Sequence, residues 1–257
     1  MSLVKYSIAN QIGRIILNRP EKRNALSPEL VRELLIAFEQ AEKDPTVKVI
    51  ILKAEGETFC AGADLAYLQQ LQHFNFEENL ADSNQLKELF TKIYTLKKVV
   101  IAQVQGHALA GGCGLATVCD FVFAVPDAKF GYTEVKIGFI PALVAVFLIR
   151  KIGEQRARQL LLSGDMIRAE EAYSMGLITK VIEAQDLEPT VINFATRLIQ
   201  TNSAQSMEST KQLIAQVQAL PLAEALSQAA RMNAQMRGTE DCKRGIAAFL
   251  NKQEIKW

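Results

Sequence analysis

The chain has no excess of charge of either sign, and this absence limits its partners. Its 257 residues carry 29 Lys and Arg against 28 Asp and Glu, a formal net charge of +1. No basic excess favours a nucleic acid as partner, and no acidic tail is present. A ligand that bears phosphate would therefore have to be held by a few well-placed Lys or Arg side chains.

Long apolar runs are also absent, and we expect no leader segment. The first residues, MSLVKYSIANQIGRIIL, pass directly into the alternating pattern of a strand, with no charged segment followed by an apolar one. No apolar run reaches the roughly 20 residues that a membrane span needs. We therefore expect no signal peptide, no membrane partner and a cytoplasmic location.

Cysteine is scarce, and its placement excludes the usual cysteine-based sites. Each cysteine lies among apolar or small residues, and no pair has the spacing of metal ligands. We interpret all of them as buried free thiols in a reducing compartment and predict neither a disulfide nor a metal site. They are Cys60, Cys113, Cys119 and Cys242.

The apolar residues that are present follow strand and helix patterns. They make up 49% of the chain, enough to bury the core of one α/β domain. Residues 4–7 and 13–17 predict a hairpin. Ser27, a good N-cap, followed by Pro28 at the first helical position, predicts the start of a helix.

Further along the chain, buried strands alternate with helices. Continuous apolar runs at 47–52, 99–104 and 121–125 predict strands that are covered on both faces. Residues 66–96 predict one long polar helical stretch. From residue 154 onward the pattern is almost wholly helical, so an α/β core is followed by an all-helical region.

Residues 106–141 hold the most informative stretch of the chain. A turn of small residues at 110–114 follows the buried run 99–104 and leads into a helix. Such a turn leaves unpaired N–H groups at the positive end of the helix, where they can hold an oxyanion. The segment 130–141 contains one carboxylate, Glu134, which can move a proton. This pairing predicts acid/base chemistry beside a stabilised carbonyl oxygen.

A second turn of small residues lies upstream, at residues 60–63, after the apolar run 49–52. Two such turns could hold one carbonyl oxygen from two sides. Glycine and alanine more often meet backbone or packing needs, so each turn taken alone favours a structural interpretation.

Five blocks resemble a known family. CAGADL at 60–65, GHALAGGCGLATVCD at 106–120 and FGYTEVKIGFIP at 130–141 are similar to the three signature blocks of the crotonase superfamily, which includes enoyl-CoA hydratases and isomerases. Residues 18–27 and 162–182 resemble its N-terminal block and its later helix–turn segment. The blocks follow the family's order over nearly the whole chain.

The resemblance implies a fold, an assembly and a substrate. The fold would be α/β, a crotonase-type ββα spiral core over residues 1–195 followed by a helical C-terminal trimerisation region at 196–257. The assembly would be a homotrimer or a dimer of trimers. The substrate would be an acyl-CoA thioester, with CoA as part of the substrate and no separate cofactor.

The resemblance also implies a catalytic set. Glu134 matches the family's catalytic glutamate, and its apolar neighbours Tyr132, Ile137, Phe139 and Ile140 would raise its pKa toward the range of a general acid or base. Ala63 and Gly111 would supply the backbone N–H groups that hold the thioester oxygen. We therefore predict an enoyl-CoA hydratase-like hydro-lyase that acts through a stabilised enolate, similar to the methylglutaconyl-CoA hydratases in the segment after Pro141.

Gly114 departs from the pattern of the family's hydratases, which usually carry a second glutamate at this position. The two-glutamate mechanism therefore cannot operate here as usually drawn. Tyr132 is a possible auxiliary group that could orient a water in place of the missing carboxylate. If the pocket keeps the usual geometry, Gly114→Glu would raise hydration by about an order of magnitude or more.

Two alternatives remain open. An enoyl-CoA delta-isomerase needs one carboxylate, which takes a proton from C2 and returns it to C4. A non-catalytic acyl-CoA-binding crotonase homologue would need neither Glu134 nor the two turns, so their presence favours an enzyme. The acyl chain that fits depends on residues 66–96 and 143–147, whose packing the sequence does not reveal.

Other polar residues match the family's CoA contacts or have structural interpretations. His107 and Asp120 are interpreted as structural, Asp120 by capping a backbone group or meeting a buried partner. The family binds CoA through an N-terminal basic pair, the turn after the second buried strand, and a C-terminal pair contributed by a neighbouring subunit. The matching residues are Lys22, Arg23, Ala61, Ala63, Asp64, Phe249 and Lys252.

Overall fold

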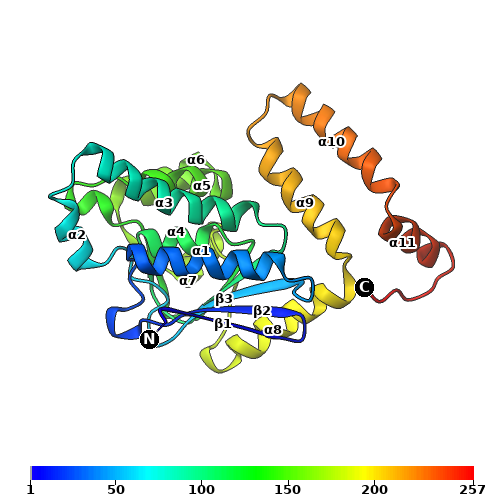
Figure 1. Cartoon of the computed structure of the whole chain (residues 1–257), viewed down its shortest axis with the longest axis horizontal. Helices are drawn as coiled ribbons and strands as arrows, with labels where there is room; N and C mark the ends of the chain where they lie inside the picture. Colours follow the sequence, from blue (N-terminus) through cyan, green and yellow to red (C-terminus); the bar gives the residue numbers. More distant parts are fainter. Residues whose placement is uncertain (1) are drawn as a thin grey trace.

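A computed structural model describes residues 2–257 and places a six-stranded sheet at the centre of the fold (Figure 1). The strand order is β1–β2–β3–β4–β6–β9. β1 and β2 form the predicted antiparallel hairpin, and every pairing from β2 to β9 is parallel. The strands are β1 (Val4–Ala9), β2 (Ile12–Leu17), β3 (Val49–Ala54), β4 (Val99–Val104), β6 (Phe121–Ala124) and β9 (Lys180–Val181).

The central strands are buried on both faces, as their continuous apolar runs predicted. All residues of β4 are buried, and all but Lys53 in β3. The helix α1 (Pro28–Lys43) covers one face, and α8 (Ala184–Thr201) covers the other (Figure 1). The predicted N-cap is confirmed, because the Ser27 hydroxyl accepts a hydrogen bond from the Leu30 N–H.

A small second sheet brings the informative blocks together. It consists of β5 (Ala108–Leu109), β7 (Lys129–Gly131) and β8 (Met166–Arg168), in the order β5–β7–β8. The helix α4 (Gly111–Thr117) follows β5, and the 3-10 helix η2 (Glu134–Ile137) follows β7. The parallel pairing of β5 with β7 therefore sets the small-residue turn and the Glu134 segment side by side.

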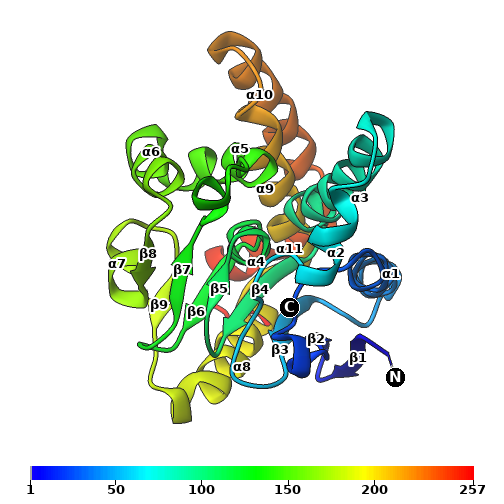
Figure 2. The same ribbon diagram turned by 90° about the vertical axis from the view of Figure 1, so that its left-hand side faces the viewer.

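The helical stretch predicted at 66–96 is two helices and not one. They are α2 (Leu65–Leu71) and α3 (Phe76–Thr95). The break has a physical cause, because Asn75 and Glu78 form a capping box that starts α3 afresh. In Figure 2 both helices lie near α1.

The C-terminal part is helical, as predicted. After α8, residues 204–250 form the helices α9, α10 and α11. We call these helices the projecting arm, because they extend away from the sheet (Figures 1 and 2). The predicted boundary at 195/196 falls inside α8, whose Leu198 and Ile199 are buried, and the division into two domains stays a prediction. The other helices are α5 (Ala142–Ile152), α6 (Glu154–Ser163), α7 (Ala169–Ser174), α9 (Ala204–Val217), α10 (Leu222–Arg237) and α11 (Glu240–Leu250).

Within residues 2–257, no helix is both long enough and apolar enough to cross a membrane. The cytoplasmic location stays a prediction. All four cysteines are free, but Cys242 is half-buried and not buried as predicted, because it lies on the projecting arm. Burial raises the pKa of Cys60 and of Cys119 to about 12, so both are neutral thiols at physiological pH.

Candidate active site

The two small-residue turns are joined through their backbones. The Cys60 N–H donates to the His107 carbonyl (3.1 Å), and the Leu109 N–H donates to the Cys60 carbonyl (3.0 Å). Gly62 has φ +92°, and a Cβ there would lie 2.9 Å from Ala110 Cβ and 3.7 Å from the Gly111 nitrogen. Glycine at position 62 therefore permits the two turns to touch.

This contact sets two N–H donors close together. Leu26 bonds to both neighbours of Ala63, accepting from the Asp64 N–H (2.9 Å) and donating to the Gly62 carbonyl (2.7 Å). The alternation of an extended chain then directs the Ala63 N–H away from Leu26. Gly111 is the first residue of α4, so its N–H has no carbonyl within the helix to bond. Both N–H groups can thus donate to one ligand oxygen.

The turn before α4 is held in a strained conformation. Ala110 has φ 49° and ψ −125°, a region that residues other than glycine rarely adopt. Its N–H is fixed by a 2.7 Å bond to the Gly131 carbonyl on β7. The strain lies next to Gly111, where a precise orientation of the N–H would matter.

Ala110→Gly is expected to stabilise the protein by about 1 kcal/mol, because glycine adopts this conformation freely. The melting temperature (Tm) should rise by roughly 2–4 °C. The matched control is Ala247→Gly, at an exposed position inside α11, which should lower Tm by a similar amount. A fall in Tm for Ala110→Gly would show that the turn is not strained.

Glu134 stands at the start of η2 as a half-buried carboxylate. Its Oε2 is buried, and no donor within residues 2–257 reaches it. Burial raises the pKa of Glu134, and a hydrogen bond from its own backbone N–H only partly offsets this. Such a carboxylate suits proton transfer. Ile137, Phe139 and Ile140, which follow it, are largely exposed and form apolar surface.

Tyr132 does not have the auxiliary role suggested by the sequence. Its side chain is fully buried, and its hydroxyl lies 2.7 Å from Thr117 Oγ1. The Thr117 hydroxyl donates its one hydrogen to the Cys113 carbonyl (2.8 Å). In the contact between the two hydroxyls, Tyr132 is therefore the donor and Thr117 the acceptor. Because no surface of Tyr132 is accessible to water, it packs the core beneath α4 and cannot orient a reacting water in this arrangement.

Gly114 has no room for a side chain. A Cβ there would lie closer than 3.0 Å to Val144 Cγ1 and 3.1 Å from Phe90 Cζ. The condition attached to Gly114→Glu, that the pocket keeps the usual geometry, is therefore not met. We therefore no longer expect a gain in hydration from the single substitution, because a glutamate would first have to displace two packed side chains.

Asp64 serves the fold of the turn. Its carboxylate pairs with Arg19 (2.7 Å) and accepts from the N–H groups of Ala66 (2.8 Å) and Tyr67 (3.2 Å). Burial acts to raise the pKa of Asp64, but these hydrogen bonds and the Arg19 charge outweigh it and leave the pKa lowered. The Asp64 side chain is thus engaged within the protein. If this turn contacts CoA, the contact would be made by the half-buried Ala61 and by Ala63.

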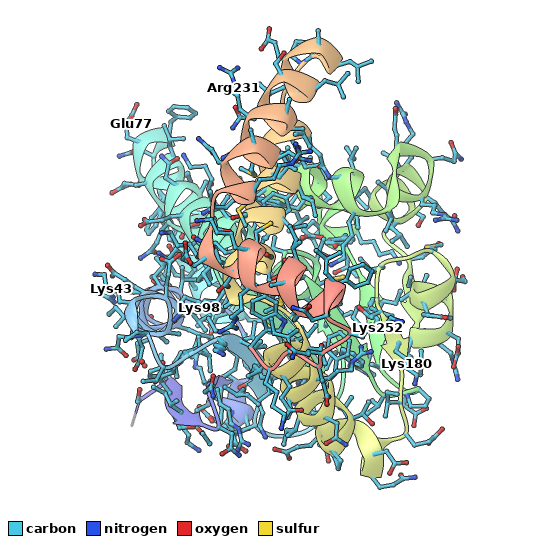
Figure 3. All side chains as sticks on the ribbon, turned by 90° about the vertical axis from the view of Figure 1, so that its right-hand side faces the viewer. Lys43, Glu77, Lys98, Lys180, Arg231 and Lys252 are labelled. Atoms are coloured by element: carbon cyan, nitrogen blue, oxygen red, sulfur yellow. The ribbon has the colours of Figure 1, made fainter. Side chains whose placement is uncertain are left out.

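The other CoA candidates lie apart from one another in a single chain. Lys22 and Arg23 are exposed beside Asn24, which is buried and bonds to the Glu55 and Thr58 carbonyls. Phe249 and Lys252 are exposed at the end of α11, on the side of the molecule opposite α2 (Figures 1 and 3). The chain does not bring this C-terminal pair to its own turns.

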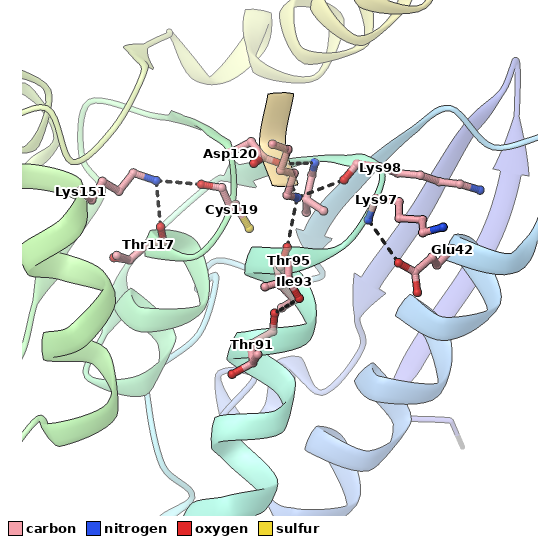
Figure 4. Close-up of polar contacts among 12 residues, drawn as sticks. Glu42, Thr91, Ile93, Thr95, Lys97, Lys98, Thr117, Cys119, Asp120 and Lys151 are labelled. Carbon is pink, nitrogen blue, oxygen red and sulfur yellow. Dashed lines mark hydrogen bonds and ion pairs between the residues drawn. The ribbon is translucent and has the colours of Figure 1, made fainter. Parts of the chain in front are cut away.

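Two lysines that sequence reasoning missed lie near the other end of α4, and Figure 4 shows the contacts of one of them, Lys151. Lys151 Nζ donates to the carbonyls of Thr117 (2.9 Å) and Cys119 (2.8 Å). Lys211 pairs with Asp120 (2.7 Å), which confirms the structural interpretation of that carboxylate. Nothing in their local sequence distinguishes these lysines from surface lysines. They line a cavity of about 770 Å³ between α5 and α9, whose lining includes no residue of the two turns.

The geometry defines a class of enzyme. Two adjoining turns with N–H groups that can donate to a ligand, beside a segment with a half-buried carboxylate, are what an oxyanion site with an acid/base group requires. Residues 7–257 match the family described as Enoyl-CoA hydratase/isomerase. The chain therefore belongs to this family of enzymes and has the crotonase fold. The relatives that it matches are named enoyl-CoA hydratases, which are hydro-lyases.

Individual proteins support this assignment. A Thermus thermophilus protein provisionally named an enoyl-CoA hydratase is 41% identical, over 94% of this chain and 95% of its own. A crotonyl-CoA hydratase of Syntrophomonas wolfei is 34% identical, over 96% and 94%. The crystal structure of an enoyl-CoA hydratase of Mycobacterium smegmatis superposes with a TM-score of 0.93 at 26% identity, covering 99% of this chain and 98% of that one.

Proposed function

We propose that this protein is an enoyl-CoA hydratase in which Glu134 alone supplies acid/base catalysis. The observation that carries the proposal is a half-buried carboxylate that no protein donor within residues 2–257 engages at Oε2, in a segment set beside two adjoining N–H donors. The hydratase names of its relatives support the same reaction.

The proposed reaction adds water across the C2–C3 double bond of an enoyl-CoA. Ionised Glu134 takes a proton from water as the water oxygen bonds to C3. The electrons of the double bond move toward the thioester oxygen, and the N–H groups of Ala63 and Gly111 stabilise the resulting enolate. Glu134 then returns the proton to C2, so both hydrogens and the oxygen of the water enter the product.

Delta-isomerisation is the second candidate, and the packing at Gly114 favours it. With no space for a second carboxylate, a water would be held by Glu134 alone. Moving a double bond from the 3,4 to the 2,3 position needs no water. In that reaction Glu134 would carry one proton from C2 to C4 while the same N–H groups stabilise the dienolate.

A pair of assays separates these candidates. With crotonyl-CoA, the absorbance of the conjugated enoyl group should fall and a 3-hydroxyacyl-CoA should form. With a 3-enoyl-CoA as substrate, a hydratase should form no conjugated enoyl product. Stable crotonyl-CoA together with rising absorbance from the 3-enoyl-CoA would make the protein an isomerase. Binding without either change, across a panel that includes 3-methylglutaconyl-CoA, would favour the non-catalytic alternative.

We also propose that the protein acts as a homotrimer or a dimer of trimers on an acyl-CoA. The projecting arm supports this, because it exposes large apolar side chains on α10 and α11. Phe249, 83% exposed, and Lys252 would then reach the CoA bound to a neighbouring subunit.

A further inference from the structure

Three helices meet at Gly114. The glycine is buried in α4, Val144 comes from α5 and Phe90 from α3. Because a Cβ on Gly114 would fall within 3.0 Å of Val144 Cγ1, a methyl group of Val144 already occupies the position of a side chain at 114. The glycine and the valine are therefore a matched pair, and neither can be understood without the other.

Neither neighbour can readily move aside. Val144 is 4% exposed, and a β-branched side chain in a helix has essentially one rotamer. Phe90 is fully buried, and its ring meets Phe147 edge-on with the centroids 6.2 Å apart. Phe147 in turn packs on Tyr94 at 5.1 Å. The contact at Gly114 is thus backed by an aromatic cluster.

We propose that Val144 determines how many carboxylates this active site can hold. Gly114 lies three residues after Gly111, so the two positions share a face of α4. Val144 fills that position with hydrocarbon and leaves Glu134 as the one acid/base group. The inference rests on the proposed function of Glu134. It makes Val144 a residue that determines reaction specificity, since it limits the site to one carboxylate.

The steric part of the proposal can be tested by thermal unfolding, without an activity assay. The variants are Gly114→Ala, Val144→Ala and the double variant. Alanine normally stabilises a helix relative to glycine. Beside Val144, however, Gly114→Ala should lower Tm by about 5 °C or more, because the core is overpacked. In the Val144→Ala background the same change should lower Tm much less, because only the contact with Phe90 remains. The matched control is Gly245→Ala in α11, where a Cβ meets Trp257 at an ordinary 3.4 Å and should not lower Tm.

The catalytic part is tested by introducing the carboxylate with and without Val144. Gly114→Glu alone should gain no crotonyl-CoA hydration. Gly114→Glu with Val144→Ala should hydrate crotonyl-CoA about tenfold faster or more than Val144→Ala alone. Its pH–rate profile should also show a second ionisation. A gain of hydration by Gly114→Glu alone, or no gain by a folded double variant, would overturn the proposal.

The two arms keep the inference separate from the proposed function. If the wild-type protein hydrates no enoyl-CoA, the hydratase proposal fails, yet the Tm cycle still reports on the pairing of Gly114 with Val144. If Gly114→Ala lowers Tm equally in both backgrounds, Val144 does not occupy the site and the inference is rejected. Should the glutamate variants fail to fold, the alanine cycle decides.

Discussion

Replacing Glu134 with Gln is expected to lower kcat for crotonyl-CoA hydration by about 10²–10⁴-fold, the usual contribution of one general acid/base group. The amide has the same shape as the carboxyl group, but it cannot take a proton from water or return one to C2. KM should change little, because the N–H groups of Ala63 and Gly111 remain. Steady-state assays of the conjugated enoyl absorbance measure both constants.

The pH dependence gives this prediction a distinctive sign. Glu134 must be ionised to accept a proton, so kcat/KM should fall on the acid side of its pKa, which burial raises above the ordinary carboxyl value. The residual activity of Glu134→Gln should lack that acid limb. Glu170→Gln, at an exposed position on α7, serves as the control and should keep full activity. A loss smaller than about tenfold for Glu134→Gln would remove Glu134 from the proton transfer.

The large elements of the fold could be predicted because their signals are local. The apolar runs of β3 and β4 and the Ser27–Pro28 start of α1 each lie within a few neighbouring residues. The short strands β5, β7 and β8 could not be predicted, because two or three residues carry no periodic pattern and their pairing depends on distant segments. The break between α2 and α3 was missed although the Asn75–Glu78 capping box is a local signal.

The candidate site shows the same difference between local signals and tertiary contacts. Glu134, Ala63 and Gly111 were predicted from blocks whose spacing resembles a known family. What surrounds them depends on tertiary packing, which no short block records. Tyr132 is adjacent in sequence to the Glu134 turn, yet its hydroxyl is committed to Thr117. Val144 is 30 positions from Gly114 (144 − 114), and only the crossing of α4 with α5 makes the two residues one feature.

Lys211 shows how strongly such tertiary contacts can matter for stability. Its side chain is 8% exposed on α9, and Nζ donates to Asp120 (2.7 Å) and to the carbonyls of Ile93 and Lys98 (both 3.1 Å). Asp120 also accepts from the Val100 N–H (2.7 Å) at the start of β4. One ammonium group thus joins the projecting arm, the end of α3 and the strand that precedes the small-residue turn at 110–114.

Lys211→Met is therefore expected to cost about 3 kcal/mol, because it leaves the partly buried Asp120 carboxylate and two backbone carbonyls without their donor. Thermal unfolding should show Tm lower by roughly 6–12 °C. Lys243→Met removes a lysine from an exposed pair with Glu240 and should stay within about 2 °C of wild type. Adding Asp120→Asn to Lys211→Met should cost less than the sum of the single changes, since the carboxylate no longer lacks its counter-charge. If Lys211→Met proved as mild as Lys243→Met, the arm would be held by its apolar contacts, and the ammonium would not join it to α3 and β4.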